Sequence, residues 1–281
     1  MIKFEHSIFA LPFAYLGLFL ALENWPTPQL FMGITVAMIS FRTMGMGLNR
    51  LIDKDIDARN PRTQNRALPQ GRLKLNFVWA VTALSFFIFE FTALKLGRLC
   101  FFLSPIPVAL AWIYPYTKRF TWSCHFVLGI LLGIAPYGAW LAGGREFSWT
   151  AGFLMLGVAS WVAGFDILYA LQDLEFDQRN GLHSFPARFG FHASLQAVGA
   201  LHASTLLFWY LAGTQAGLGL IYRAGLGIIA LLLVREHAQV RKFGIAKINE
   251  TFFTANARVS LSIFLMVLLD LIRTRSGAGA V

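Results

Sequence analysis

Apolar segments of similar length alternate with short polar segments along almost the whole chain. An α-helix needs about 20 mostly apolar residues to cross the hydrocarbon core of a bilayer, and about nine segments approach that length. They lie near residues 7–23, 30–48, 76–94, 99–116, 122–142, 149–170, 192–212, 216–234 and 254–272. The pattern therefore predicts an all-α, polytopic membrane protein with about nine transmembrane helices, in which residues 1–281 form a single integral-membrane domain.

Composition and charge agree with this interpretation. Of the 281 residues, 57% are hydrophobic and 14% are charged, whereas a soluble domain has about 45–50% apolar and about 25% charged residues. In a soluble protein the net charge of +10 could indicate nucleic-acid binding. In a membrane protein, basic loops fix the orientation and meet anionic lipid. We therefore expect membrane lipid, and no nucleic acid, among the partners.

The lysines and arginines fall mainly after the second, fourth, sixth and eighth apolar segments. Because cytoplasmic loops carry an excess of Lys and Arg, this distribution places those loops and the amino terminus on the cytoplasmic side. The expected location is the bacterial inner membrane, with any site in those loops facing the cytoplasm. The first segment resembles a signal peptide, but LENWP follows it where a cleavage site would need small residues. We interpret it as the first membrane helix.

Two Asp-rich segments lie at the cytoplasmic ends of the second and sixth apolar segments. Each places three polar side chains on one helical face, at spacings of four or seven residues. The residues are Asn49, Asp53 and Asp57 in the first segment and Asp166, Asp173 and Asp177 in the second. Carboxylates at one membrane face can hold Mg²⁺, which is usually bound by one or two carboxylates together with substrate phosphates. The basic residues Arg62, Arg66 and Lys118 would neutralise the remaining phosphate charge.

Three segments resemble signatures of the UbiA superfamily of intramembrane prenyltransferases. They are Asn49-x3-Asp53-x3-Asp57 with Pro61-Arg62-Thr63 and Asn65-Arg66, then Tyr114-Pro115-x2-Lys118-Arg119, and finally Asp166-x2-Tyr169-Ala170-x2-Asp173-x3-Asp177-x3-Gly181. The resemblance implies a helical bundle around a central cavity that is capped on the cytoplasmic side. It also implies Mg²⁺-dependent transfer of a prenyl chain from a polyprenyl diphosphate to an aromatic acceptor. Within the superfamily the chain is most similar to the 4-hydroxybenzoate polyprenyltransferases of quinone biosynthesis.

The resemblance assigns expected roles to individual residues of this chain. The catalytic carboxylates are Asp53, Asp57, Asp173 and Asp177, and Asn49 joins them as a Mg²⁺ ligand. The diphosphate-binding residues are Arg62, Arg66, Tyr114, Lys118 and His183. The acceptor-binding residues are Arg42, Asp166 and Tyr169. One departure is that Gly181-Leu182-His183-Ser184 stands where many relatives have Gly-x-Lys-Ser, so that a partly charged histidine replaces a permanent cation.

Arg42 stands within apolar sequence, seven residues before Asn49 and therefore on the same helical face, about two turns deeper. An arginine inside a membrane helix costs several kcal/mol unless it faces a cavity or a partner. Arg42 could also extend to the interface between water and lipid. The resemblance favours a role in binding the carboxylate of the acceptor.

Other assignments remain open on the sequence. The acceptor could be 4-hydroxybenzoate or a dihydroxynaphthoate-type acid. An ion-coupled transporter predicts charged residues spread along several spans, whereas the aspartates here gather at one face. A CDP-alcohol phosphotransferase would also use Mg²⁺, but its order of Asp-Gly, Ala-Arg and Gly is absent.

Overall fold

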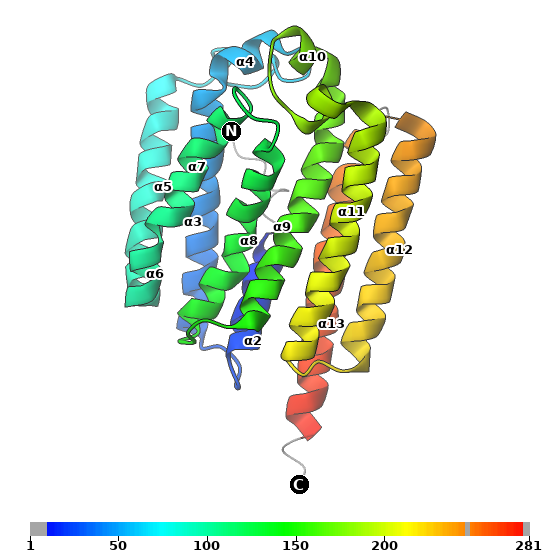
Figure 1. Cartoon of the computed structure of the whole chain (residues 1–281). Helices are drawn as coiled ribbons and strands as arrows, with labels where there is room; N and C mark the ends of the chain where they lie inside the picture. Colours follow the sequence, from blue (N-terminus) through cyan, green and yellow to red (C-terminus); the bar gives the residue numbers. More distant parts are fainter. Residues whose placement is uncertain (1–9, 245–247, 278–281) are drawn as a thin grey trace.

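The computed structural model describes residues 10–244 and 248–277 and contains only helices and loops within those ranges (Figure 1). The helices are α2 (Leu11–Ala21), α3 (Pro28–Ile52), α4 (Lys54–Arg59), α5 (Leu75–Leu96), α6 (Arg98–Leu103), α7 (Pro105–Thr117), α8 (Cys124–Ala142), α9 (Trp149–Ala170), the 3₁₀ turn η1 (Leu171–Asp173), α10 (Leu174–Arg179), α11 (Phe185–Gln215), α12 (Leu220–Phe243) and α13 (Ile248–Gly277). Each of the nine predicted apolar segments coincides with a helix, although residues 7–9 of the first lie outside the described residues. The predicted fold class is confirmed.

Seven helices of the described chain are long and apolar enough to cross a membrane. They are Pro28–Ile52, Leu75–Leu96, Arg98–Thr117, Cys124–Ala142, Trp149–Arg179, Phe185–Gln215 and Thr254–Arg275. The shorter α2 is apolar over 11 residues, and α12 carries Arg223, Arg235 and Glu236 within its length. The chain is thus an integral membrane protein whose helices differ in how strongly each one favours lipid.

Local chemistry sets where several helices begin or bend. Pro105 occupies the first turn of α7, where its missing N–H costs nothing, and it divides the fourth predicted segment into α6 and α7. Within α11, Gly190 has φ 81° and ψ 178°, which only glycine adopts without strain. The kink there separates the first turns of α11 from its long membrane segment.

The helix that carries each Asp-rich segment breaks at the same kind of residue. Asp53 ends α3 with φ −93° and ψ 7°, and Asp173 precedes α10 with φ −101° and ψ 5°. This sparsely allowed bridge region is where many active-site residues lie. After each break a short helix begins, and its first turn carries the next aspartate of the motif, Asp57 or Asp177.

The two short helices α4 and α10 lie at the same end of the bundle, across the ends of the long helices (Figure 1). Helices α8, α9 and α11 pack side by side, and α3 packs against α5 and α7. Segments that are more than 100 residues apart in the chain therefore meet at one end of the bundle.

This arrangement predicts a labelling pattern. In a chain whose two cysteines are replaced by alanine, an impermeant thiol reagent should modify Gln64→Cys and Gln178→Cys from the same side of the membrane. It should modify Glu146→Cys, in the loop between α8 and α9, from the other side. All three native side chains are exposed. Labelling of positions 64 and 178 from opposite sides would contradict a common end for α4 and α10.

Candidate active site

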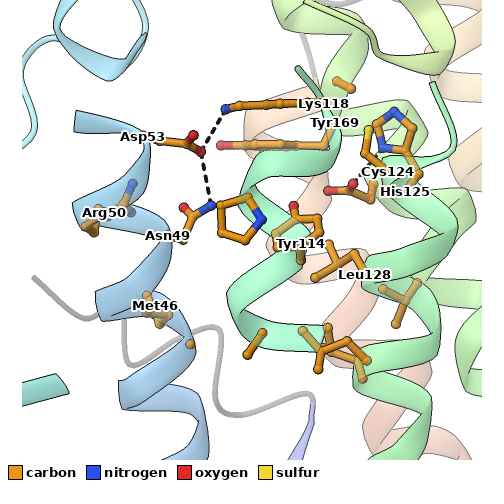
Figure 2. Close-up of a pocket in the computed structure, with 18 of the residues that line it drawn as sticks. Met46, Asn49, Arg50, Asp53, Tyr114, Lys118, Cys124, His125, Leu128 and Tyr169 are labelled. Atoms are coloured by element: carbon orange, nitrogen blue, oxygen red, sulfur yellow. Dashed lines mark hydrogen bonds and ion pairs between the residues drawn. The ribbon is translucent and has the colours of Figure 1, made fainter. Parts of the chain in front are cut away.

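A cavity of about 370 Å³ lies beneath α4 and α10 and is lined by α3, α7, α8, α9 and the loop that follows α4. Figure 2 shows its polar end, where side chains from α3 point toward side chains from α7, α8 and α9. The charged residues of the lining gather near the ends of the helices, and the residues deeper in the bundle are mostly apolar. The cavity therefore offers a charged mouth and an apolar floor to a single ligand.

Asp53 is 3% exposed and accepts hydrogen bonds from two side chains (Figure 2). The Lys118 ammonium lies 2.8 Å from Oδ2, and the Asn49 amide nitrogen lies 3.2 Å from the same atom. Arg119 adds a longer contact, 3.7 Å from Oδ1. Burial raises the pKa of Asp53, and Lys118 opposes that shift. Oδ1 is buried and has no hydrogen-bond partner among the described residues, so the Arg119 ion pair is its one polar contact there.

Asp57 lies one helical turn beyond Asp53 and is 5% exposed. One Arg66 nitrogen contacts both carboxylate oxygens at 2.7 Å, and Arg50 lies 3.5 Å from Oδ2. Thr63 donates a hydrogen bond to the backbone carbonyl of Asp57. Thr63 and Arg66, both in the loop after α4, thus hold that loop against Asp57 of α4.

Asp173 joins the second Asp-rich segment to the first. Two Arg62 nitrogens donate hydrogen bonds to its carboxylate, and Nε lies 2.8 Å from Oδ1. Asn60 donates to the same oxygen at 2.9 Å. The remaining Arg62 nitrogen donates to the Tyr169 hydroxyl at 2.9 Å, and the guanidinium lies 4.8 Å from the centre of that ring. This network is the direct link between the loop after α4 and the end of α9.

Asp177 has a neutral partner. The Ser184 hydroxyl donates to its Oδ2 at 2.7 Å, and the same hydroxyl accepts from the Ala187 backbone N–H at the start of α11. Ser184 therefore caps α11 and fixes Asp177 with one side chain.

The donor set fits Mg²⁺ that is shared with a phosphorylated ligand. Among the described residues, no three His, Cys, Asp or Glu side chains lie close enough together to hold a metal by themselves. Mg²⁺ does not need such a cage, because it keeps several waters and takes its remaining ligands from phosphate. Asn49, Asp53, Asp57, Asp173 and Asp177 all line the cavity, and Asp53 Oδ1 has no hydrogen-bond partner among the described residues. These are the oxygen donors that would hold the ion.

Deeper in the cavity, Arg42 and Asp166 stand apart from the upper network. Arg42 lines the cavity, and its buried Nε has no hydrogen-bond partner among the described residues. Asp166 lies beside His125, with 2.6 Å between Oδ2 and the imidazole Nδ1. Tyr114, on α7, also lines the cavity and lies below Lys118 in the view of Figure 2.

A second cavity of about 290 Å³ continues into the apolar part of the bundle. It shares Met38, Phe41, Leu131 and Ala135 with the first cavity. The rest of its lining is almost wholly apolar and comes from α2, α3, α5, α6, α7, α8 and α9. The two spaces together suit a ligand with a charged head and a long hydrocarbon chain.

The structure brings nearly every predicted site residue to this cavity. Those that line it are Arg42, Asn49, Asp53, Asp57, Arg62, Arg66, Tyr114, Lys118, Asp166, Tyr169, Asp173 and Asp177. His183 is exposed and is not among them. Its backbone N–H donates to the Lys118 carbonyl at 2.6 Å, so the residue positions a loop while its side chain points elsewhere.

Four residues of the site were not expected from the sequence: Arg50, Asn60, His125 and Ser184. Arg50 and Asn60 stand beside the first motif, so the spacing of the motif could have indicated them. His125 begins an apolar helix, and nothing in its neighbourhood marks it. Ser184 follows His183 in the segment where relatives have Gly-x-Lys-Ser, and only the fold shows that it is the serine that faces Asp177.

Comparisons with known proteins agree with this geometry. Residues 10–258 match the UbiA prenyltransferase family. The solved UbiA homologue of Aeropyrum pernix K1 is 32% identical, has a TM-score of 0.87, and is covered over 100% of its length by 96% of this chain. A protein of Francisella tularensis subsp. novicida named 4-hydroxybenzoate octaprenyltransferase is 28% identical over 91% of this chain and 89% of its own.

A further solved structure shares the fold alone. It is a UbiA homologue from Archaeoglobus fulgidus bound to GPP and Mg²⁺, with 18% identity, a TM-score of 0.69, and coverage of 94% of this chain and 95% of its own.

The fold and the charged cavity define a membrane-embedded enzyme of prenyl transfer. The chain belongs to the UbiA prenyltransferase family. This membership argues against the transporter and the CDP-alcohol phosphotransferase.

Proposed function

We propose that the protein transfers a polyprenyl group from a polyprenyl diphosphate to 4-hydroxybenzoate, with Mg²⁺, at the cytoplasmic face of the bacterial inner membrane. The observation that carries this proposal is the layering of one cavity. Two Asp-rich segments with their cations form its mouth, and below them Arg42 has a buried Nε with no hydrogen-bond partner in the described part of the chain. Relatives named 4-hydroxybenzoate octaprenyltransferase support the acceptor, and the A. fulgidus homologue bound to GPP and Mg²⁺ supports the donor.

The charged mouth suits the diphosphate. Asn49 and the aspartates of both segments would hold Mg²⁺, which when bound neutralises charge on the departing diphosphate. Arg62, Arg66 and Lys118 now neutralise aspartates, and a phosphate would offer each of them a more highly charged partner. These side chains stabilise the transition state because negative charge grows on the leaving group as the carbon–oxygen bond breaks.

The allylic cation that forms must be kept away from water. The loop after α4, tied to Asp173 through Arg62, covers the mouth of the cavity. The ring of Tyr169 already contacts the Arg62 guanidinium through its π face, which is the geometry that stabilises positive charge. Tyr169 and Tyr114 are therefore suited to shield the cation from water. The apolar second cavity is suited to receive the prenyl chain.

Arg42 is suited to the carboxylate of the acceptor. Its planar guanidinium can bind a carboxylate through two parallel hydrogen bonds. A ring held in this way would present its hydroxyl end toward the mouth of the cavity, where the allylic carbon forms. A dihydroxynaphthoate-type acid also carries a carboxylate, and an assay with both acids separates the two acceptors.

The first prediction concerns the metal. Chelation of Mg²⁺ should abolish turnover of a labelled prenyl diphosphate with 4-hydroxybenzoate. Asp53→Asn and Asp173→Asn should each lower kcat by about a hundredfold or more, because they remove a charge that acts in the transition state. Asp55→Asn is the matched control, since Asp55 is exposed and does not line the cavity. Full activity in excess chelator would rule out the metal-dependent mechanism.

The second prediction concerns Arg42. Truncating one partner of a desolvated charged pair costs about 2–5 kcal/mol, so Arg42→Ala should lower kcat/KM for 4-hydroxybenzoate by roughly a hundredfold or more. Arg42→Lys should recover only part, because lysine has no planar fork. Activity on phenol, which lacks the carboxylate, should be low in the native protein and nearly unchanged in the variant.

Two controls accompany the Arg42 variants. Arg98→Ala changes an exposed arginine that does not line the cavity, and it should leave both activities intact. The thermal stability of Arg42→Ala should not fall, because the removed charge has no ion-pair partner among the described residues. Equal losses on 4-hydroxybenzoate and phenol would show that Arg42 does not bind the carboxylate.

A further inference from the structure

His125 is fixed by two hydrogen bonds, one of them to Asp166. The imidazole is 3% exposed and lies at the start of α8, with Nδ1 2.6 Å from Asp166 Oδ2. Its other nitrogen, Nε2, accepts a hydrogen bond from the Phe185 backbone N–H at 3.2 Å. A ring nitrogen that accepts a hydrogen bond carries no proton, so the imidazole proton is on Nδ1 and is donated to Asp166.

Asp166 differs from the other aspartates of the cavity. Asp53, Asp57 and Asp173 each pair with a lysine or an arginine, and Asp177 pairs with the Ser184 hydroxyl. The only partner of Asp166 among the described residues is His125. Its side chain is 20% exposed and lines the cavity, and its Oδ1 has no hydrogen bond within the described part of the chain. One oxygen is therefore anchored and the other is open to a ligand.

The depth of Asp166 places it between the diphosphate level and Arg42. Helices α3 and α9 run toward the same end of the bundle (Figure 1). Asp166 precedes Asp173 by seven residues, or about 10 Å along a helix. Arg42 precedes Asp53 by eleven residues, or about 16 Å. An acceptor whose carboxylate is held by Arg42 and whose ring points toward the mouth brings its hydroxyl end to the level of Asp166.

We propose that Asp166 accepts the proton of the acceptor hydroxyl during prenyl transfer, and that His125 is the positioning residue that directs Asp166 to this task. The inference rests on the proposed function and adds to it the proton acceptor that the reaction requires. Net transfer releases one proton. The cations that hold Asp53, Asp57 and Asp173 would disfavour proton uptake by them, and Asp177 already accepts a hydrogen bond from the Ser184 hydroxyl, which opposes its protonation.

The step balances as follows. The carbon–oxygen bond of the prenyl diphosphate breaks, and its electron pair leaves with the diphosphate. A carbon–carbon bond forms between the allylic carbon and the ring carbon next to the hydroxyl. The hydroxyl proton passes to Asp166, which leaves a dienone. The proton on the newly bonded ring carbon then moves to the dienone oxygen and restores the aromatic ring, so the net proton released is the one on Asp166.

A carboxylate is a weak base for a resting phenol, because their ordinary pKa values differ by about six units. As the new carbon–carbon bond forms, positive charge enters the ring and the hydroxyl becomes strongly acidic. A positioned carboxylate is then an effective acceptor, and such general bases contribute about 10²–10⁴-fold to the rate. The fixed orientation supplied by His125 matters because the proton must move while the bond forms.

The first test uses Asp166→Asn. With 4-hydroxybenzoate, kcat should fall by about 10²–10⁴-fold, while binding of labelled prenyl diphosphate in Mg²⁺ is retained. The loss should shrink with 3-fluoro-4-hydroxybenzoate assayed above the pKa of its more acidic hydroxyl, since an ionised acceptor has no hydroxyl proton to give. An equal loss on both acceptors would overturn the role of Asp166.

The second test compares two substitutions of His125. In His125→Asn the amide N–H can take the place of Nδ1 and donate to Asp166, while the contact to Phe185 is lost. In His125→Gln the amide oxygen can take the place of Nε2 and keep Phe185, while Asp166 loses its partner. We expect His125→Asn to retain at least tenfold more kcat than His125→Gln, with rescue by the fluorinated acceptor in the latter. His192→Gln, on the exposed face of α11, is the matched control.

The outcomes are separable. A purely structural role for His125 would give equal losses in the two variants, with no rescue and with lowered thermal stability, and would overturn the positioning role. If the native protein itself fails to prenylate 4-hydroxybenzoate, the proposed function fails and this inference fails with it. Native turnover together with an unimpaired Asp166→Asn would overturn the inference alone.

Discussion

The site depends on the pairing of buried carboxylates with cations that other segments supply. Asp53 and Asp57 are almost fully buried near the end of a membrane helix, where an unpaired carboxylate would be strongly destabilising. Lys118, directly after α7, neutralises Asp53, and Arg66 from the loop after α4 neutralises Asp57. Arg62 extends the pairing to Asp173 at the end of α9. Because each pair joins different segments, the same contacts that neutralise charge also close the end of the bundle.

These pairs suit a site that must exchange partners. A buried ion pair contributes little net stability, because the cost of desolvation nearly equals the attraction. The cations around the cavity can therefore leave a carboxylate for a phosphate without a large loss, provided that another cation takes their place beside the carboxylate. The carboxylates that they release would then be free to hold Mg²⁺. Binding of the diphosphate and binding of the metal would therefore favour each other. Folding and ligand binding thus use the same side chains in succession.

The sequence predicted the helices because the length of an apolar run is a local property. The Asp-rich segments were expected to lie on continuous helical faces, but the helices break at Asp53 and Asp173, so that Asp57 and Asp177 lie on separate short helices. The pairing of charges was not predictable in the same way, since Lys118 reaches Asp53 across 65 positions. The sequence also does not predict which side chains face the cavity where a helix begins. His183 and Ser184 are neighbours, yet only the serine lines the cavity. Long-range pairing also holds Asp270 on α13, which accepts from the Gly219 backbone N–H at the start of α12, 51 positions away.

The matched breaks at Asp53 and Asp173 create two half-sites with similar backbones and unequal charge. The half around Asp53 and Asp57 holds Lys118, Arg66 and Arg50. The half around Asp173 and Asp177 holds Arg62 and a neutral serine. A prenyl diphosphate is also uneven, because its terminal phosphate carries more charge than the esterified one. For the proposed donor, two equal half-sites would allow binding in either direction, whereas this imbalance would favour one direction and would so set which way the carbon chain leaves the cavity.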